Sequence, residues 1–272
     1  MTVQDVYTIN QSAECPGVVL TREVAVREID GWSQHLYVYQ PAKKPASLLP
    51  ALMLVHGGGF QEGDAASNFC IARYLALELG MAVFSPNYRL ASPGSPTYPK
   101  PVEDIAFAWN WVRDNAAQWG VDADKVFVGG TSAGGALTAM ALTKGLLPNC
   151  QGLVECWGPI DFIARWFDNG GAPGAEGVLF GSNYPLNPTL YHEASALTHV
   201  KSGLPPAVFI YGNQDPVVHK RQGELGLAAW QSVGSHAELS TFDNIGHGIV
   251  GDNTAQECQV TLRIAEFLRG LI

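Results

Sequence analysis

A serine framed by glycines is the clearest chemical signal in the sequence. The segment Gly130–Gly134 reads Gly-Thr-Ser-Ala-Gly and places Ser132 between an apolar run and a stretch of good helix formers. A serine nucleophile must project from a tight strand-to-helix turn, where bulky side chains two positions away would collide with the backbone. The following helix also points its first N–H groups at the position where negative charge develops. The pattern therefore predicts Ser132 as a nucleophile.

Such a serine needs a base, and His247 is the histidine in the best position to supply it. His247 lies in the glycine-bounded segment Asn244–Gly248, just before the last predicted helix. Asp215 follows an apolar, strand-like run and is the expected partner that orients the imidazole. Asp161, which also follows a strand, and Asp243, which lies near His247 in sequence, remain alternatives for that role. The order serine, aspartate, histidine along the chain is one of the known orders of such triads.

Glycines after an apolar run predict the groups that would stabilise a developing oxyanion. The run Ala51–Val55 leads directly into His56–Gly59, which contains three consecutive glycines. Glycine lets backbone N–H groups approach an oxyanion with no side chain between them. We therefore expect this loop and the backbone N–H of Ala133 to form an oxyanion hole. A dinucleotide fingerprint would need glycine at Thr131 or Ser132, so a nucleotide site is excluded on spacing.

The elements that must position these residues alternate between apolar runs and amphipathic stretches, which is typical of βα repetition around a mostly parallel sheet. We expect strands at 36–39, 51–55, 81–85, 126–128, 153–156 and 207–211, and helices at 102–112, 136–143 and 255–268. No linker or repeat divides the chain. The sequence therefore predicts one α/β domain over residues 1–272, with helices on both faces of the sheet and a reduced lid at residues 157–200, after the sixth core strand.

Aromatic residues gather in and beside the irregular stretch that follows the strand at 153–156. The members are Trp157, Phe162, Trp166, Phe167, Phe180 and Tyr184. Aromatic side chains more often pack in a core than face a ligand. Six of them in an irregular segment nevertheless favour a substrate pocket, and we expect Trp157, Phe162 and Trp166 to line it. Phe60 and Gln61, next to the oxyanion glycines, are further candidates for substrate binding.

Composition excludes several other functions. Of 272 residues, 15% are charged and the net charge is −9, with basic residues scattered along the chain. A nucleic-acid binder needs a clustered cationic face, so we expect no such partner. No histidine pair has H-E-x-x-H spacing and no Cys/His cluster is present, so we expect neither a metal nor another cofactor.

Features that bear on location favour the cytoplasm. No apolar run approaches the roughly 18–20 residues that span a bilayer, and the first twenty residues lack a secretory pattern. Five widely spaced cysteines without a C-x-x-C motif favour free thiols in a reducing compartment. We therefore expect a cytoplasmic protein that acts on a small ester, and the sequence leaves open whether it forms a homodimer.

Five ordered motifs make the chain resemble α/β-hydrolases of the hormone-sensitive-lipase-like esterase group and related acetyl and feruloyl esterases. They are His56–Phe60, Asn87–Leu90, Gly130–Gly135, Gly212–Val217 and Gly246–Gly248. The resemblance runs from about residue 36 to the C-terminus. It implies an α/β-hydrolase fold without a cofactor. Only some 35 residues precede the first expected strand, so any cover over the site must come mainly from residues 157–200.

The resemblance also implies roles for individual residues. Ser132 would be the nucleophile, Asp215 the acid and His247 the base, with oxyanion donors at Gly58, Gly59 and Ala133; Asn87–Leu90 and Asp104 would be structural. The expected activity is hydrolysis of short-chain or aromatic carboxylic esters through an acyl-enzyme. An amide hydrolase such as a formamidase uses the same triad and remains an alternative. A non-catalytic small-molecule receptor on this fold is disfavoured by the intact triad.

Overall fold

A single sheet of eight strands forms the centre of the protein in the computed structural model, which describes residues 16–248 and 254–272. The strands are β1 (Val18–Ile29), β2 (Trp32–Pro41), β3 (Leu49–Val55), β4 (Ala82–Pro86), β5 (Val121–Thr131), β6 (Leu153–Cys156), β7 (Ala207–Gly212) and β8 (Ala237–Phe242). Their order across the sheet is β1-β2-β4-β3-β5-β6-β7-β8. β2 pairs antiparallel with β1 and with β4, and all other pairs are parallel. The predicted mostly parallel sheet is confirmed.

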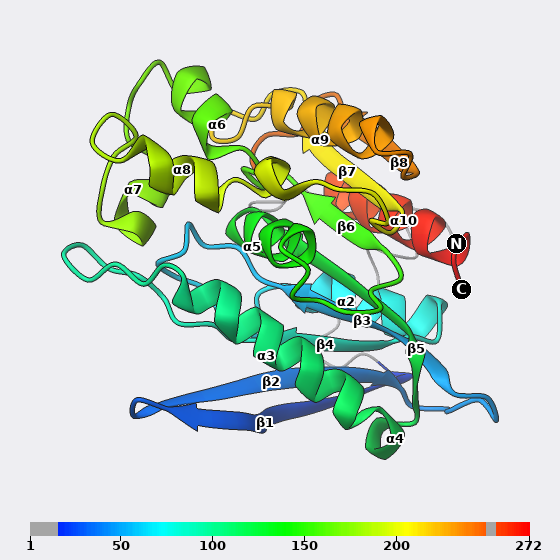
Figure 1. Ribbon diagram of the computed structural model, residues 1–272. Helices are drawn as coiled ribbons and strands as arrows, with labels where there is room; N and C mark the ends of the chain where they lie inside the picture. Colours follow the sequence, from blue (N-terminus) through cyan, green and yellow to red (C-terminus); the bar gives the residue numbers. More distant parts are fainter. Residues whose placement is uncertain (1–15, 249–253) are drawn as a thin grey trace.

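Helices cover both faces of this sheet, as predicted. The longer ones are α2 (Phe69–Glu78), α3 (Lys100–Asp114), α5 (Ala133–Thr143), α9 (Arg221–Ser232) and α10 (Thr254–Arg269), and the short α4 (Ala116–Trp119) leads into β5. Figure 1 shows α3 and α5 in front of the sheet and α2 and α10 behind it. No helix in the described part of the chain is long and apolar enough to cross a membrane.

Short helices fill the segment between β6 and β7. They are α6 (Phe162–Asp168), α7 (Ala175–Phe180), α8 (Pro188–Ala194) and the 3-10 helix η1 (Ala196–His199). α6 to α8 stand together at one end of the sheet in Figure 1. The chain therefore carries its insertion after the sixth strand, as expected, whereas the function of residues 157–200 as a lid stays a prediction. We call α6 to α8 and their connections the insertion.

Two edge strands depart from the sequence prediction. The first strand begins at Val18, not at residue 36, and β8 was not expected at all. β1 is largely exposed, and register shifts between Thr21 and Val24 and between Ala25 and Arg27 interrupt its pairing with β2. Alternation of apolar and polar residues marks a strand only where one face is buried in regular register. The bulged β1 therefore gave a weak signal, and the mostly half-buried β8 shows no regular alternation of buried and exposed positions.

Candidate active site

Ser132 lies in a sharp turn between β5 and α5. Its backbone has φ 51° and ψ −120°, and residues other than glycine rarely adopt a positive φ. The Ser132 N–H donates to the carbonyl of Cys156 at 2.8 Å. A Cβ at Gly134 would collide with the carbonyl oxygen of Val55, and one at Gly130 would collide with Gly134 itself. The two glycines are needed because three backbone segments meet here, which agrees with the steric argument from the sequence.

The structure brings Ser132, His247 and Asp215 into one hydrogen-bonded series. Ser132 Oγ lies 2.8 Å from His247 Nε2, and His247 Nδ1 lies 2.8 Å from Asp215 Oδ2. The Asp215 side chain is fully buried, and its Oδ1 accepts the backbone N–H groups of Val217 and Val218 at 2.7 and 2.8 Å. Its carboxylate is thus fixed from both oxygens and holds the imidazole toward Ser132.

The alternative acidic residues have other partners. Asp161 caps α6, because its Oδ1 accepts the N–H groups of Ile163 and Ala164, both at 2.9 Å. Asp243 accepts the side-chain amide of Asn213 at 2.6 Å. Of these three aspartates, Asp215 is the one that contacts His247 in the structure, and its role as the acid stays a prediction.

His56, the other histidine near Ser132, is buried in the loop that follows β3. Its ring stacks on Tyr88 with 4.4 Å between centroids, and its Nδ1 lies 2.7 Å from the carbonyl oxygen of Gly57. Burial lowers the pKa of His56, so the ring stays neutral at physiological pH. Stacked in this way, His56 supports the glycine loop.

The glycine loop approaches Ser132 from β3. Gly58 has φ 112°, and a Cβ there would collide with the carbonyl of Glu62, whose own N–H donates back to the Gly58 carbonyl at 3.0 Å. Gly58, Gly59 and Ala133 all border the same cavity as Ser132. The loop is further held by Tyr88, whose hydroxyl donates to the His56 carbonyl at 3.2 Å.

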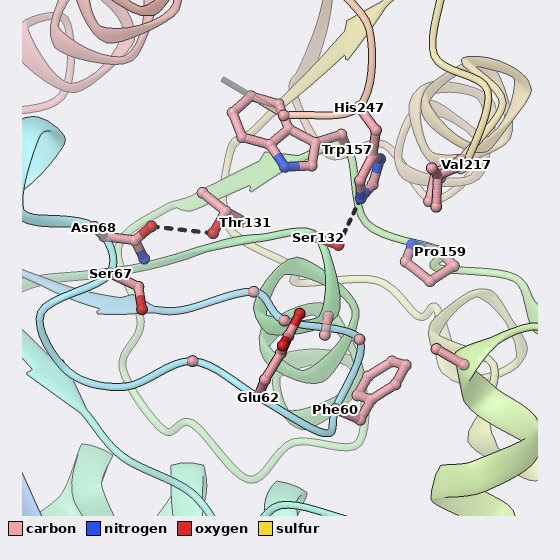
Figure 2. Close-up of a pocket in the computed structure, with 18 of the residues that line it drawn as sticks. Phe60, Glu62, Ser67, Asn68, Thr131, Ser132, Trp157, Pro159, Val217 and His247 are labelled. Atoms are coloured by element: carbon pink, nitrogen blue, oxygen red, sulfur yellow. Dashed lines mark hydrogen bonds between the residues drawn. The ribbon is translucent and has the colours of Figure 1, made fainter. Parts of the chain in front are cut away.

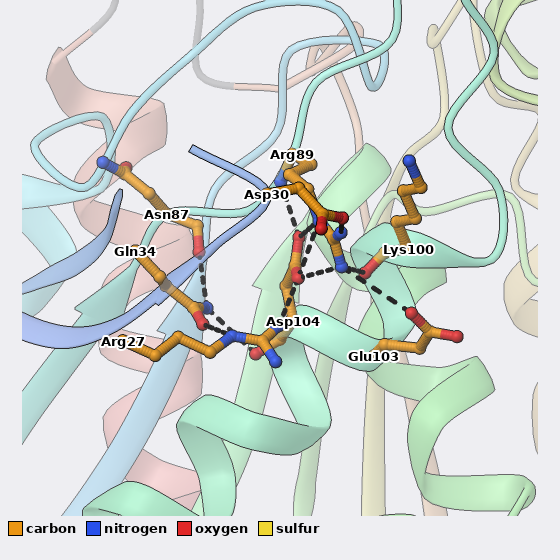
Figure 3. A network of polar contacts seen from close by, with 8 residues as sticks. All are labelled: Arg27, Asp30, Gln34, Asn87, Arg89, Lys100, Glu103 and Asp104. Carbon is orange, nitrogen blue, oxygen red and sulfur yellow. Dashed lines mark hydrogen bonds and ion pairs between the residues drawn. The ribbon is translucent and has the colours of Figure 1, made fainter. Parts of the chain in front are cut away.

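Buried charges anchor the segment that carries Tyr88. The fully buried Asp104 of α3 accepts from Arg89 Nε at 2.9 Å and Nη2 at 2.6 Å, and from Arg27 Nη2 at 2.5 Å (Figure 3). Gln34 of β2 donates to the carbonyls of Asn87 and Asp104 at 3.0 and 2.9 Å. β1, β2 and α3 are thereby tied to Asn87–Leu90, which supports the structural role that the sequence assigned to this segment and to Asp104.

A cavity of about 910 Å³ opens over Ser132. Phe60, Gln61 and Trp157 line it, as expected from the sequence, and Figure 2 shows Phe60 and Trp157 on different sides of the serine. Ser132, Phe60 and Trp157 are all non-glycine residues with positive φ. Backbone strain of this kind is stored at functional sites. No group of three His, Cys, Asp or Glu residues within 16–248 and 254–272 is arranged to hold a metal ion.

The structure does not bring Phe162 and Trp166 to this cavity. Phe162 is fully buried and packs edge-to-face on Phe180, with 5.2 Å between ring centroids. Trp166 packs against Tyr184, with 6.0 Å between ring centroids. Phe180 and Tyr184 in turn pack on Tyr191 of α8. These aromatic side chains pack on one another within the insertion, together with the fully buried Leu179. Of the aromatic residues from 157 onward that we expected in the pocket, Trp157 is the one that lines it.

Charged residues near the site were missed by the sequence reasoning, among them Glu62, which lines the cavity, and Glu155 and Arg165. Glu155 in β6 is fully buried, accepts the Gly158 N–H at 2.5 Å and lies against Gly135 behind the serine turn. Burial raises the pKa of Glu155 to about 8. Arg165 in α6 borders the cavity. A carboxylate inside an otherwise apolar strand was a usable signal for Glu155, whereas Arg165 had none in the sequence.

Comparison with known sequences agrees with this architecture. Residues 36–230 match the family model described as BD-FAE. Esterase LipQ from Mycobacterium tuberculosis is 28% identical over 245 residues, a match that covers 84% of this chain and 57% of LipQ. The chain thus spans less than two thirds of the length of LipQ, and the same holds for Esterase LipC, of which 58% is covered.

Solved structures of esterases share the fold. A truncated carbohydrate esterase from gut microbiota superposes with a TM-score of 0.79 at 21% identity, covering 93% of this chain and 96% of that one. Esterase 2 from Thermogutta terrifontis, with propionate bound, gives a TM-score of 0.75 at 26% identity and covers 94% of each chain. The same esterase has been solved phosphorylated by paraoxon, with a TM-score of 0.73. The expected α/β-hydrolase fold is confirmed.

Proposed function

Because this chain belongs to the BD-FAE family of the α/β-hydrolase esterase group, we propose that it is a serine hydrolase that cleaves small carboxylic esters through an acyl-enzyme. The observation that carries the proposal is the series Ser132–His247–Asp215, in which both contacts are 2.8 Å and the serine faces a cavity. Esterase relatives of similar fold support the ester as the substrate class.

In the first half of the reaction, Ser132 Oγ attacks the ester carbonyl while His247 Nε2 accepts its proton. Asp215 holds the Nδ1–H tautomer and stabilises the imidazolium that forms. The N–H groups of Gly58, Gly59 and Ala133 bind the oxyanion of the tetrahedral intermediate. His247 then protonates the departing alcohol, which leaves the acyl group bonded to Ser132.

In the second half, His247 takes a proton from water as the water oxygen attacks the acyl carbonyl, and it then returns that proton to Ser132 Oγ as the bond from the acyl carbon to Oγ breaks, which releases the acid and free Ser132. The acyl groups that we expect are short aliphatic or aromatic chains. Propionate bound to the Thermogutta esterase agrees with a short acyl group. The proposed substrate contacts border the same cavity as Ser132 and are Phe60, Gln61 and Trp157.

A panel of para-nitrophenyl esters of increasing acyl length tests this function. We expect turnover of the short and aromatic esters by the native chain and a loss of roughly 10³-fold or more in kcat for Ser132→Ala. Paraoxon should add one phosphoryl group to the native chain and none to Ser132→Ala, which mass spectrometry detects. Turnover that survives in Ser132→Ala would overturn the proposed mechanism.

A further inference from the structure

Arg165 is a charged side chain built into the wall of the cavity. It lies on α6 of the insertion, its side chain is 7% exposed, and it borders the same cavity as Ser132. A buried guanidinium is costly unless its charge is compensated and its N–H groups have acceptors. The contacts of Arg165 therefore show what it is arranged to do.

Protein acceptors use one part of the guanidinium and leave another free. Arg165 Nε donates to Glu176 Oε2 at 2.9 Å, and Nη1 donates to the Val217 carbonyl at 2.6 Å. Among the residues that the structure describes, Nη2 has no acceptor. Since Arg165 carries five N–H donors and borders the cavity, the unused donors are available to a bound molecule.

The local charge balance decides which kind of molecule fits. Glu176 is fully buried and pairs with Arg165, so the pair has no net charge to attract an anion. Glu62 also lines the cavity, and the buried Asp215 carboxylate lies behind His247. A substrate carboxylate would meet these negative groups, whereas an uncharged oxygen accepts a hydrogen bond at no such cost.

We propose that Arg165 is a specificity-determining residue whose Nη2 donates to an uncharged oxygen of the substrate, such as an ether, hydroxyl or carbonyl oxygen remote from the scissile ester. This inference rests on the ester hydrolysis proposed above. It predicts a preference for oxygen-bearing esters over purely alkyl esters of the same shape. A hydrogen bond from a charged donor is worth enough to give a roughly ten- to hundredfold preference.

Matched substrates test the proposal. In para-nitrophenyl pentanoate an ether oxygen replaces the second or the third methylene from the carbonyl carbon, and in pentyl acetate it replaces the third or the fourth methylene from the ester oxygen, so that every compound is still an ester with a separate ether and the acyl and alcohol parts are probed separately. In the native chain we expect kcat/KM for at least one ether ester to exceed that of its alkyl parent roughly tenfold. Arg165→Met should abolish this preference. A preference that is equal in the native chain and in Arg165→Met, or absent from both series, would overturn the proposal.

The ratio of kcat/KM between two matched esters separates a direct contact of Arg165 with the substrate from its support of the turn after Asp215. Losing the hydrogen bond from Arg165 to the Val217 carbonyl affects all esters equally and leaves that ratio unchanged. Arg165→Lys keeps a charge for Glu176 but lacks the second nitrogen of the fork, so it should fold and still lose the preference. Arg221→Met is the matched control, since it breaks an ion pair with Asp168 of α6 at a half-exposed arginine outside the cavity lining. It should keep the native ratios.

Two further arms complete the experiment. A hemi-ester of succinate, which carries a free carboxylate, should be a poor substrate. A higher kcat/KM for this hemi-ester than for the ether esters would show that Arg165 binds a negative charge, contrary to the proposal. Ser132→Ala is run on the same panel. Activity that survives in this variant would remove the proposed esterase mechanism, whereas a changed ether preference in Arg165→Met concerns the new contact alone.

Discussion

At the scale of single residues, the proposed chemistry depends on how Asp215 is held. The serine and histidine are 115 positions apart in the chain, and the histidine and aspartate are 32 apart. Asp215 uses one oxygen to anchor its own turn and the other to orient His247. A change that keeps the shape but removes the charge therefore isolates the contribution to catalysis.

Asp215→Asn should lower kcat by roughly 10³- to 10⁴-fold with little change in KM, because the amide favours the wrong imidazole tautomer. Its oxygen can still accept the N–H groups of Val217 and Val218, so thermal stability should change little. Ester hydrolysis and melting curves measure the two effects. Asp243→Asn is the matched control and should retain full activity. The assignment of the acid would be wrong if the control, and not Asp215→Asn, lost turnover.

At the scale of elements, the glycine loop depends on contacts far from Ser132. The segment Asn87–Leu90 is held by side chains of β1, β2 and α3, which are Arg27, Gln34 and Asp104. Within this segment, the Tyr88 hydroxyl donates to the His56 carbonyl at the start of the glycine loop. Arg89 and Asp104 form a buried, two-pronged ion pair whose loss leaves guanidinium groups without a counter-charge. Breaking such a pair is far more costly than breaking an exposed one.

Asp104→Asn should lower the free energy of unfolding by about 3 kcal/mol, because a neutral amide cannot balance Arg27 and Arg89. Urea denaturation monitored by tryptophan fluorescence measures the change. Asp30→Asn removes a carboxylate that is 77% exposed and 3.9 Å from Arg89, and should cost less than about 1 kcal/mol. Equal losses in the two variants would contradict the importance of the buried network.

The insertion is a second element whose position bears on the site. Arg165 joins α6 to the turn after Asp215, and a Cβ at Gly59 of the glycine loop would lie 3.3 Å from the Cβ of Ala175 in α7. The aromatic core of the insertion gives it internal packing of its own. The residues of the insertion that border the cavity are thus Arg165 and Ala175, and not Phe162 or Trp166.

At the scale of the whole molecule, Glu155 links the stability of the fold to pH. Burial raises the pKa of this carboxyl from 4.5 to about 8. Below pH 4.5 both the folded and the unfolded chain hold the proton, and above pH 8 both release it. Between these values the folded chain binds more protons, so this group makes the free energy of unfolding fall as pH rises.

Glu155→Gln should remove that contribution, because glutamine has no proton to lose. The slope for one group approaches about 1.4 kcal/mol per pH unit. The variant should therefore gain stability relative to the native chain, by on the order of 3 kcal/mol, when the pH is raised from 5 to 7.5. Urea denaturation at both values measures the gain. Glu266→Gln, at a residue whose side chain is 75% exposed, should show no such trend, and a native slope unchanged by Glu155→Gln would contradict the buried proton.

Local patterns in the sequence were enough to predict the fold class and the class of enzyme. Buried strands such as Leu49–Val55 and Ala207–Gly212 are continuous apolar runs, and α3 has a clear apolar stripe. The serine turn was predictable because the glycines that it requires, Gly130 and Gly134, lie two positions on either side of Ser132 in the chain. The single-domain organisation and the cytoplasmic location stay predictions, and the oligomeric state stays open.

Only the tertiary structure decided which distant side chains meet. Asp161 and Asp215 both follow strands, and sequence spacing alone could not show that Asp161 caps a helix while Asp215 reaches His247. The pocket aromatics were misjudged for the same reason, since an aromatic residue looks the same in sequence whether it packs in a core or lines a cavity. Glu155 and Arg165 acquire their importance from burial and from partners in other elements. Steric rules act between neighbours and can be read locally, whereas burial and pairing depend on how the whole chain folds.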